Sequence, residues 1–183
     1  MTTTEHELVE ALYRVEGKAE IINGKIVPLE MPGYDPNFAA AEIYVSLRSH
    51  VRRTQVGRAA TDGLFFIVDL PHRMSFAPDA SYFTNPPSGM KFVEGAPDFA
   101  AEVRSENDYG PAAERAMAAK CADYFAAGTL VVWDVDLLDE NVVRVYRAGN
   151  ADRPAATYRR GQFAEAEPAV PGWTMPVDDL FEA

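Results

Sequence analysis

The passage from residue 97 to residue 136 constrains the fold more than any other part of the chain. PDFAAEVRS at 97–105 is a short, largely apolar run typical of a buried strand, and TLVVWDVD at 129–136 is another. Between them, the alanine-rich residues 111–127 end at Gly128, which predicts a helix with a glycine stop. A strand, a long helix and a second strand normally form a parallel crossover. The sequence therefore predicts an α/β fold.

Hairpin signals precede this crossover. In AEIINGKIVPL at 19–29, Asn23 and Gly24 lie between two β-prone runs, which is the strongest short-range signal for a hairpin. Residues 57–69 favour two strands and residues 76–83 a third. Because hairpin strands are antiparallel and crossover strands are parallel, we expect a mixed central β-sheet flanked by helices, with an N-terminal hairpin extension.

Two more helices and the length of the chain complete the expected organisation. Apolar residues at helical spacing predict a short helix over 5–14 and a longer one over 37–54. A chain of 183 residues can bury one core without metal or disulfide support. We expect an N-terminal helical segment, 1–17, followed by a single domain, 18–183.

The net charge of the chain is strongly negative, at −11. Nucleic-acid binders normally gain affinity by neutralising phosphates with Lys and Arg, so this composition argues against strong nonspecific binding to DNA. Arg48, Arg52 and Arg53 lie close together in the sequence, so a local basic face is compatible with an acidic whole. A solvated helix face is the simpler interpretation of this cluster.

Cysteine and histidine are scarce. The one cysteine, Cys121, lies within an apolar helical stripe and is expected in the core, and the three histidines lack zinc-ligand spacing. The sequence shows neither a leader peptide nor an apolar run of membrane-spanning length. We therefore expect a cytoplasmic protein with no membrane partner.

Two acidic residues occupy otherwise apolar strands. Asp79 lies in FAPDASYF and Glu102 in PDFAAEVRS. Burial of an unpaired carboxylate is costly, so each needs a cation, a donor or an open cleft. On neighbouring strands the two can share a hard cation such as Mg²⁺. Asp98 cannot join Glu102 on one ion, because the two lie about 13 Å apart along one strand at ~3.3 Å per residue.

Two basic residues lie near these carboxylates in the expected fold. Arg104 shares a strand face with Glu102, and Lys120 lies at the edge of the apolar stripe of the following helix. A lysine there can extend toward the carboxylates, hold a scissile phosphate and position or deprotonate an attacking water. Arginine can supply charge but does not serve readily as a base.

Five blocks follow one another along nearly the whole chain. They are AEIINGKIV, FAPDASYF, PDFAAEVRSENDY, KCADYFAAGTLVVWDVD and PAVPGWTMPVDDLF. Together they resemble the Uma-type putative restriction endonucleases, a bacterial branch of the PD-(D/E)XK nuclease superfamily. The resemblance implies a restriction-endonuclease-like core, metal-dependent hydrolysis of DNA phosphodiester bonds and a homodimer.

The resemblance also assigns roles to residues. It implies that Asp79 and Glu102 hold Mg²⁺ or Mn²⁺, and that Lys120 is the active-site lysine, moved from the strand to the helix. Glu20, in the hairpin block E-x-x-x-G, is a candidate for the first acidic position, and Glu42 is an alternative. From the pattern alone, Glu20 is more typical of a hairpin or surface residue.

Two departures from the family pattern keep a second function open. Residues 37–40, Asn-Phe-Ala-Ala, stand where members usually carry a histidine, and Arg104 stands at a usually aliphatic position. In the leading interpretation, Arg104 assists the metal ligands and Lys120. The alternative is a nuclease-fold protein that has lost activity and serves as a binding or assembly module.

Overall fold

The computed structural model describes residues 3–86 and 89–181. The helices are α1 (Thr3–Leu12), α2 (Tyr34–Thr54), α3 (Pro111–Ala126) and the 3-10 helix η1 (Val177–Leu180). The strands are β1 (Ala19–Ile22), β2 (Lys25–Pro28), β3 (Arg58–Thr61), β4 (Phe66–Leu70), β5 (Arg73–Phe76), β6 (Ala80–Phe83), β7 (Val93–Glu94), β8 (Phe99–Val103), β9 (Val131–Asp136), β10 (Val142–Arg147), β11 (Ala156–Arg159), β12 (Phe163–Glu165) and β13 (Thr174–Pro176).

The central sheet has six strands in the order β11-β10-β9-β8-β6-β3. Strands β8 and β9 are parallel and α3 connects them, as the crossover pattern predicts. The other neighbouring pairs of this sheet are antiparallel. The predicted mixed sheet is therefore confirmed.

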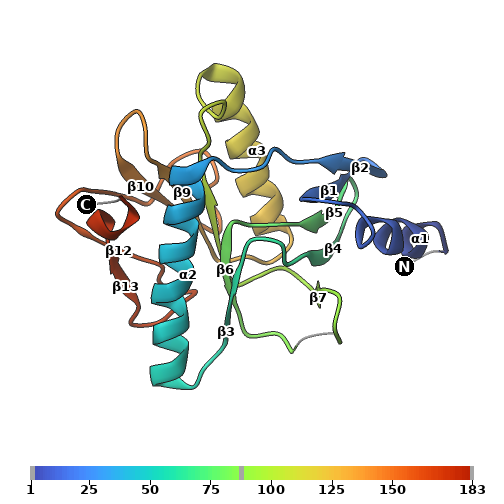
Figure 1. The fold of residues 1–183 in the computed structure, drawn as a ribbon, viewed down its shortest axis with the longest axis horizontal. Helices are drawn as coiled ribbons and strands as arrows, with labels where there is room; N and C mark the ends of the chain where they lie inside the picture. The colour runs from blue at the N-terminus through green and yellow to red at the C-terminus, as the bar shows by residue number, and fades with distance from the viewer. Residues whose placement is uncertain (1–2, 87–88, 182–183) are drawn as a thin grey trace.

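The central sheet lies between α2 and α3 (Figure 1). Alternate residues of β8 and β9 divide between the two faces. Phe99 and Trp133 join the core cluster that includes α2, and Ala100 and Val132 join the cluster that includes α3. Glu102 has the same parity as Ala100, so its side chain belongs to the α3 face.

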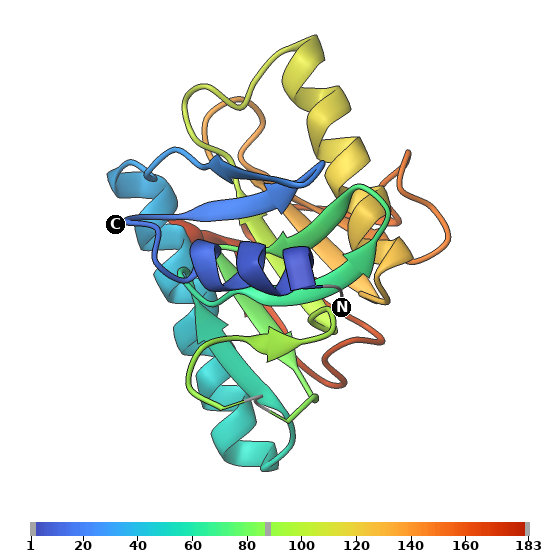
Figure 2. The ribbon, with the colours of Figure 1, turned by 90° about the vertical axis from the view of Figure 1, so that its right-hand side faces the viewer.

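A second sheet, in the order β2-β1-β5-β4-β7, carries the N-terminal hairpin. Asn23 and Gly24 have positive φ angles of 51° and 68°, the left-handed conformation that such a turn requires. Helix α1 packs against this sheet, in front of it in Figure 2. The two strands expected over residues 57–69 belong to different sheets, because β3 pairs with β6 and β4 with β5.

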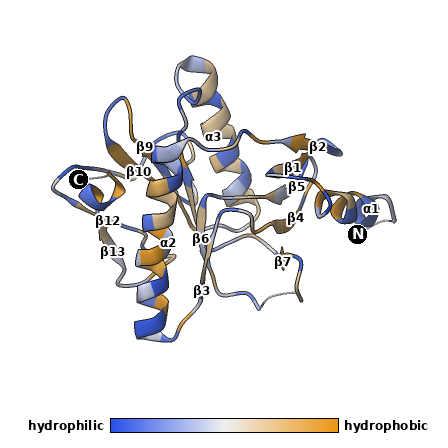
Figure 3. Ribbon diagram, viewed as in Figure 1, coloured by the Kyte–Doolittle hydropathy of each residue, from blue (hydrophilic) through white to orange (hydrophobic). Residues whose placement is uncertain are grey.

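The surface of α2 is mixed in character (Figure 3). Ile43 and Leu47 are fully buried, whereas Arg48, Arg52 and Arg53 are exposed, as expected for a solvated helix face. Within residues 3–86 and 89–181, no helix combines the length and the apolar character needed to cross a membrane.

Candidate active site

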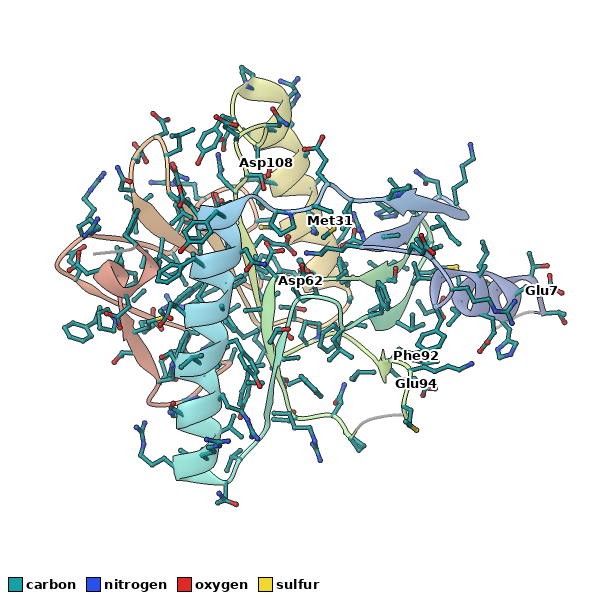
Figure 4. The ribbon with its side chains drawn as sticks, in the orientation of Figure 1. Glu7, Met31, Asp62, Phe92, Glu94 and Asp108 are labelled. Carbon is teal, nitrogen blue, oxygen red and sulfur yellow. The ribbon has the colours of Figure 1, made fainter. Side chains whose placement is uncertain are left out.

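A cleft of about 450 Å³ opens between the segment after β2, the end of β8 and the first turns of α3. Two carboxylates and two ammonium groups are among the side chains that line it: Asp79, Glu102, Lys18 and Lys120. In Figure 4, Asp62, which pairs with Lys18, lies near the centre of the view, below Met31 and Asp108. Asp62 therefore marks in this view the position to which the ammonium of Lys18 extends.

Asp79 is held firmly against β8. It precedes β6, and its backbone N–H donates to the carbonyl of Ala101 over 3.0 Å. The backbone N–H of Val103 donates to Asp79 Oδ2 over 2.7 Å. The other oxygen, Oδ1, lies 2.5 Å from the ammonium of Lys18. One oxygen of Asp79 is thus fixed by the backbone, and the other accepts from a side-chain cation.

Glu102 is the acidic residue of β8 and is 8% exposed. The hydroxyl of Tyr124 donates to Oε1 over 2.6 Å, and Lys120 Nζ donates to Oε2 over 2.7 Å. Burial raises the pKa of Glu102, and the nearby Asp79 adds to this effect against the opposing lysines. The carboxylate is therefore desolvated and held by two donors from α3.

Lys120 connects Glu102 to a third carboxylate. Its Nζ lies 3.3 Å from Glu20 Oε1, and the other oxygen of Glu20 pairs with Arg73. Burial alone would lower the pKa of Lys120, but Glu102 and Glu20 outweigh burial and raise it. Burial raises the pKa of Glu20, and Lys120 and Arg73 outweigh that and lower it.

The surface interpretation of Glu20 is wrong. The residue is 1% exposed, because β1 is covered on both faces and directs this side chain toward Arg73 and Lys120. The backbone N–H of Ala77 also donates to Glu20 Oε1, over 3.1 Å. Three donors therefore compensate the burial of this carboxylate.

Lys18 supplies a second ammonium to the cleft. Its Nζ lies 2.5 Å from Asp79 Oδ1 and 2.9 Å from Asp62 Oδ1, and its side chain is 8% exposed. Burial favours loss of the proton, but Asp79 and Glu102 outweigh it and raise the pKa of Lys18. Lys18 is thus a buried cation shared by two aspartates.

Arg104 lines the cleft, but its guanidinium is directed elsewhere. It donates to both oxygens of Asp134, from Nε over 2.6 Å and from one terminal nitrogen over 2.7 Å. It also pairs with both oxygens of Glu114. The structure therefore brings together Asp79, Glu102, Lys120 and Glu20, while Arg104 is committed to two other carboxylates.

Comparison with known proteins supplies the family. The family model Uma2, described as putative restriction endonuclease, matches residues 7–178. This chain belongs to the Uma2 family. The crystal structure of a putative nuclease belonging to DUF820 from Anabaena variabilis has the same fold, with a TM-score of 0.71 and 21% identity over 95% of this chain and 97% of that one. No curated protein matches.

The other sequence candidates lie outside the cleft of this Uma2 chain. Asp98 accepts from the N–H and hydroxyl of Thr84, at the far end of β8. Glu42, on α2, is half-buried and is not among the described residues that line the cleft. Cys121 is fully buried, and burial raises the pKa of its thiol to about 12, so it is a core residue as predicted.

Three partners of Asp79, Glu102 and Glu20 were not predicted from the sequence, namely Lys18, Tyr124 and Arg73. Tyr124 is four residues after Lys120, so helical spacing places both on the side of α3 that faces Glu102. Lys18 is two residues before Glu20, so strand parity places them on one side of the chain. These spacings could have identified Tyr124 and Lys18. Arg73, on β5, pairs with Glu20, on the neighbouring strand β1, and no local pattern in the sequence indicates that contact.

Proposed function

We propose that this protein is a metal-dependent DNA endonuclease that hydrolyses phosphodiester bonds. One observation carries the proposal. Asp79 and Glu102, far apart in the chain, both line one cleft next to the ammonium of Lys120, in a member of a family described as restriction endonucleases. Carboxylates and an amine in one cleft are the groups that hydrolysis of a phosphodiester requires.

The cleft offers Mg²⁺ or Mn²⁺ a pair of carboxylates, and among the residues that the structure describes no group of three or more Asp, Glu, His or Cys side chains is placed to hold a metal ion, so water and substrate would supply the other ligands. Both ions prefer oxygen ligands, and Asp79 and Glu102 offer carboxylate oxygens that already attract cations, since Lys18 and Lys120 lie against them. A bound ion would polarise the scissile phosphate and lower the pKa of a water molecule. Val103 and Tyr124 would hold the two carboxylates in place for it.

The protein's own residues act on the phosphate. Lys120 presents a positive charge at the base of the cleft, where it can hold a phosphate oxygen and stabilise the negative charge that develops during hydrolysis. Glu20 and Arg73 position Lys120, because Glu20 links the two cations. Arg104 fixes the end of β8 against Asp134 and thus supports Glu102 from two residues away.

DNA and a second copy of the chain are the proposed partners. A net charge of −11 disfavours broad contact with the phosphate backbone, so we expect recognition to be local. A symmetric homodimer would place two clefts on one duplex, and such pairs are the commonest oligomers. We expect this reaction to take place in the cytoplasm.

The test is cleavage of supercoiled plasmid with Mg²⁺ or Mn²⁺. Wild type should nick the plasmid, and Asp79→Ala and Glu102→Ala should each slow nicking by at least about 10³-fold, because removal of a metal ligand removes transition-state charge stabilisation. Asp98→Asn is the matched control, an acid that directly precedes β8 and lies outside the cleft, and its nicking rate should stay near that of wild type. Equal rates for wild type and both alanine variants would refute the proposal.

One observation favours the alternative, an inactive binding or assembly module. All four carboxylate oxygens of Asp79 and Glu102 already accept from donors of the protein, so the site is satisfied without a metal. Calorimetric titration with Mn²⁺ separates the two functions. An inactive module should bind no Mn²⁺ through these carboxylates. A nuclease should bind Mn²⁺, and its Asp79→Ala variant should not.

A further inference from the structure

Lys18 is a buried ammonium with two acceptors. Asp79 Oδ1 lies 2.5 Å from its Nζ and Asp62 Oδ1 lies 2.9 Å away. The two acceptors differ in their surroundings, because the side chain of Asp79 is 14% exposed and that of Asp62 is 28% exposed. Lys18 thus touches an inner carboxylate, in the cleft, and an outer one in the turn between β3 and β4.

The ammonium covers the oxygen that a metal would need. Asp79 Oδ2 is fixed by the backbone N–H of Val103, which cannot move without disturbing β8. Oδ1 accepts instead from the side chain of Lys18, so a metal could replace this contact without a shift of the backbone. Lysine carries its charge on a flexible chain with three rotatable donors, so its ammonium can change acceptor without a change in the backbone.

The charges in the cleft show how the contact between Lys18 and Asp79 affects the binding of a cation. Asp79 and Glu102 bring two negative charges, and Lys18 and Lys120 bring two positive charges. A divalent cation that approaches the two carboxylates is repelled by both ammonium groups at short range. Removal of one lysine would leave the pair with a net negative charge and increase the attraction for the cation.

We propose that Lys18 is an internal cation that competes with the divalent metal for Asp79 and so sets the metal affinity of the site. If a metal were bound to Asp79, the ammonium of Lys18 would keep Asp62, which lies 2.9 Å from it, as its acceptor. This inference rests on the proposed metal site, since it states that a metal bound there must first displace Lys18 from Asp79. In this role Lys18 acts on the metal only through its contact with Asp79.

The experiment is calorimetric titration of the full chain with Mn²⁺. Lys18→Met should bind Mn²⁺ at least about tenfold more tightly than wild type, because a unit charge at contact distance from the site is removed. Lys25→Met is the matched control: it removes the same charge from an exposed position on β2 and should leave the affinity unchanged. The double variant Lys18→Met/Asp79→Asn should not bind Mn²⁺ more tightly than wild type, because the added affinity depends on the carboxylate of Asp79.

A second readout covers the possibility that Lys18→Met folds poorly. Lys18→Gln keeps a hydrogen-bond donor for Asp79 without the charge, and its thermal unfolding midpoint should rise more with added Mn²⁺ than that of wild type. Equal affinities and equal midpoint shifts for wild type and both variants would overturn the inference while the metal dependence stood. Absence of Mn²⁺ binding in all of them would overturn both. DNA cleavage enters neither measurement.

Discussion

Two clusters of paired charges lie on the same side of β8 and β9 and differ in how they are held. We call them the cleft cluster and the framework cluster. The cleft cluster is Lys18, Asp79, Glu102 and Lys120. The framework cluster is Arg104, Glu114, Asp134, Asp136 and Arg144. In the first the cations are lysines, and in the second they are arginines.

This difference indicates that the cleft cluster can react with a ligand, whereas the framework cluster stabilises the fold. Arg104 binds both oxygens of Asp134 through a planar fork, a geometry that resists rearrangement, and Asp134 is fully buried. Each cleft lysine instead offers a single ammonium to carboxylates that line an open cavity. Substrate or metal can displace a lysine contact far more readily than a bidentate arginine pair.

The largest expected effect is on stability, in the framework cluster. Arg104→Met should lower the free energy of unfolding by about 3–5 kcal/mol, because it leaves the buried carboxylate of Asp134 without its main partner. Arg104→Lys keeps the charge but loses the fork, so its loss should be intermediate. Urea denaturation measures both. A wild-type midpoint for Arg104→Met, with impaired Mn²⁺ binding, would place Arg104 in the cleft cluster instead.

In the cleft cluster the main effect should be on the reaction. Lys120→Met should slow plasmid nicking by about 10²-fold, equivalent to about 2.7 kcal/mol of transition-state stabilisation. Tyr124 and Arg73 still hold Glu102 and Glu20, so unfolding should become easier by only about 1–2 kcal/mol. Lys25→Met serves as the control for lost charge. Full nicking activity in Lys120→Met would remove this lysine from the mechanism.

The smallest effect concerns pH and Asp136. Burial raises the pKa of Asp136, but the backbone N–H groups of Asp139 and Glu140 and the hydroxyl of Tyr109 outweigh burial and lower it. A carboxyl whose pKa is lower in the folded state stabilises the protein fully above the ordinary value, 3.8, and this contribution disappears as the pH falls through the folded value.

Acid denaturation followed by circular dichroism checks this sign. Between neutral pH and the acid transition, Asp136→Asn should show a weaker dependence of stability on pH than wild type. Asp152→Asn, on an exposed loop, should keep the wild-type dependence. A steeper dependence in Asp136→Asn would contradict the assignment.

Much of the fold follows from local patterns in the sequence. The strand, helix and strand between residues 97 and 136 predict the parallel pair β8–β9, and parity along β8 places Glu102 on the α3 face. The division of β3 and β4 between two sheets has no such signal, because both segments are equally β-prone. Strand pairing at long range depends on the packing of the whole domain.

The candidate site was predictable to a similar extent. Carboxylates in apolar strands identify Asp79 and Glu102, since such residues need compensation. Glu20 also lies in an apolar strand and is compensated, but the strand is short, and its partner Arg73 comes from a distant hairpin, so the local pattern resembled that of a surface residue. For Arg104, strand parity predicts the correct face, beside Glu102. Its partners, Asp134 and Glu114, are known only from the tertiary structure.

The most direct test of the proposed metal site is a crystal structure of the protein soaked with Mn²⁺, read by anomalous diffraction. The proposal predicts one peak in the cleft beside the carboxylates of Asp79 and Glu102, with the ammonium of Lys18 on Asp62. A cleft without a peak at millimolar Mn²⁺, with Lys18 still on Asp79 and Lys120 still on Glu102, would contradict it.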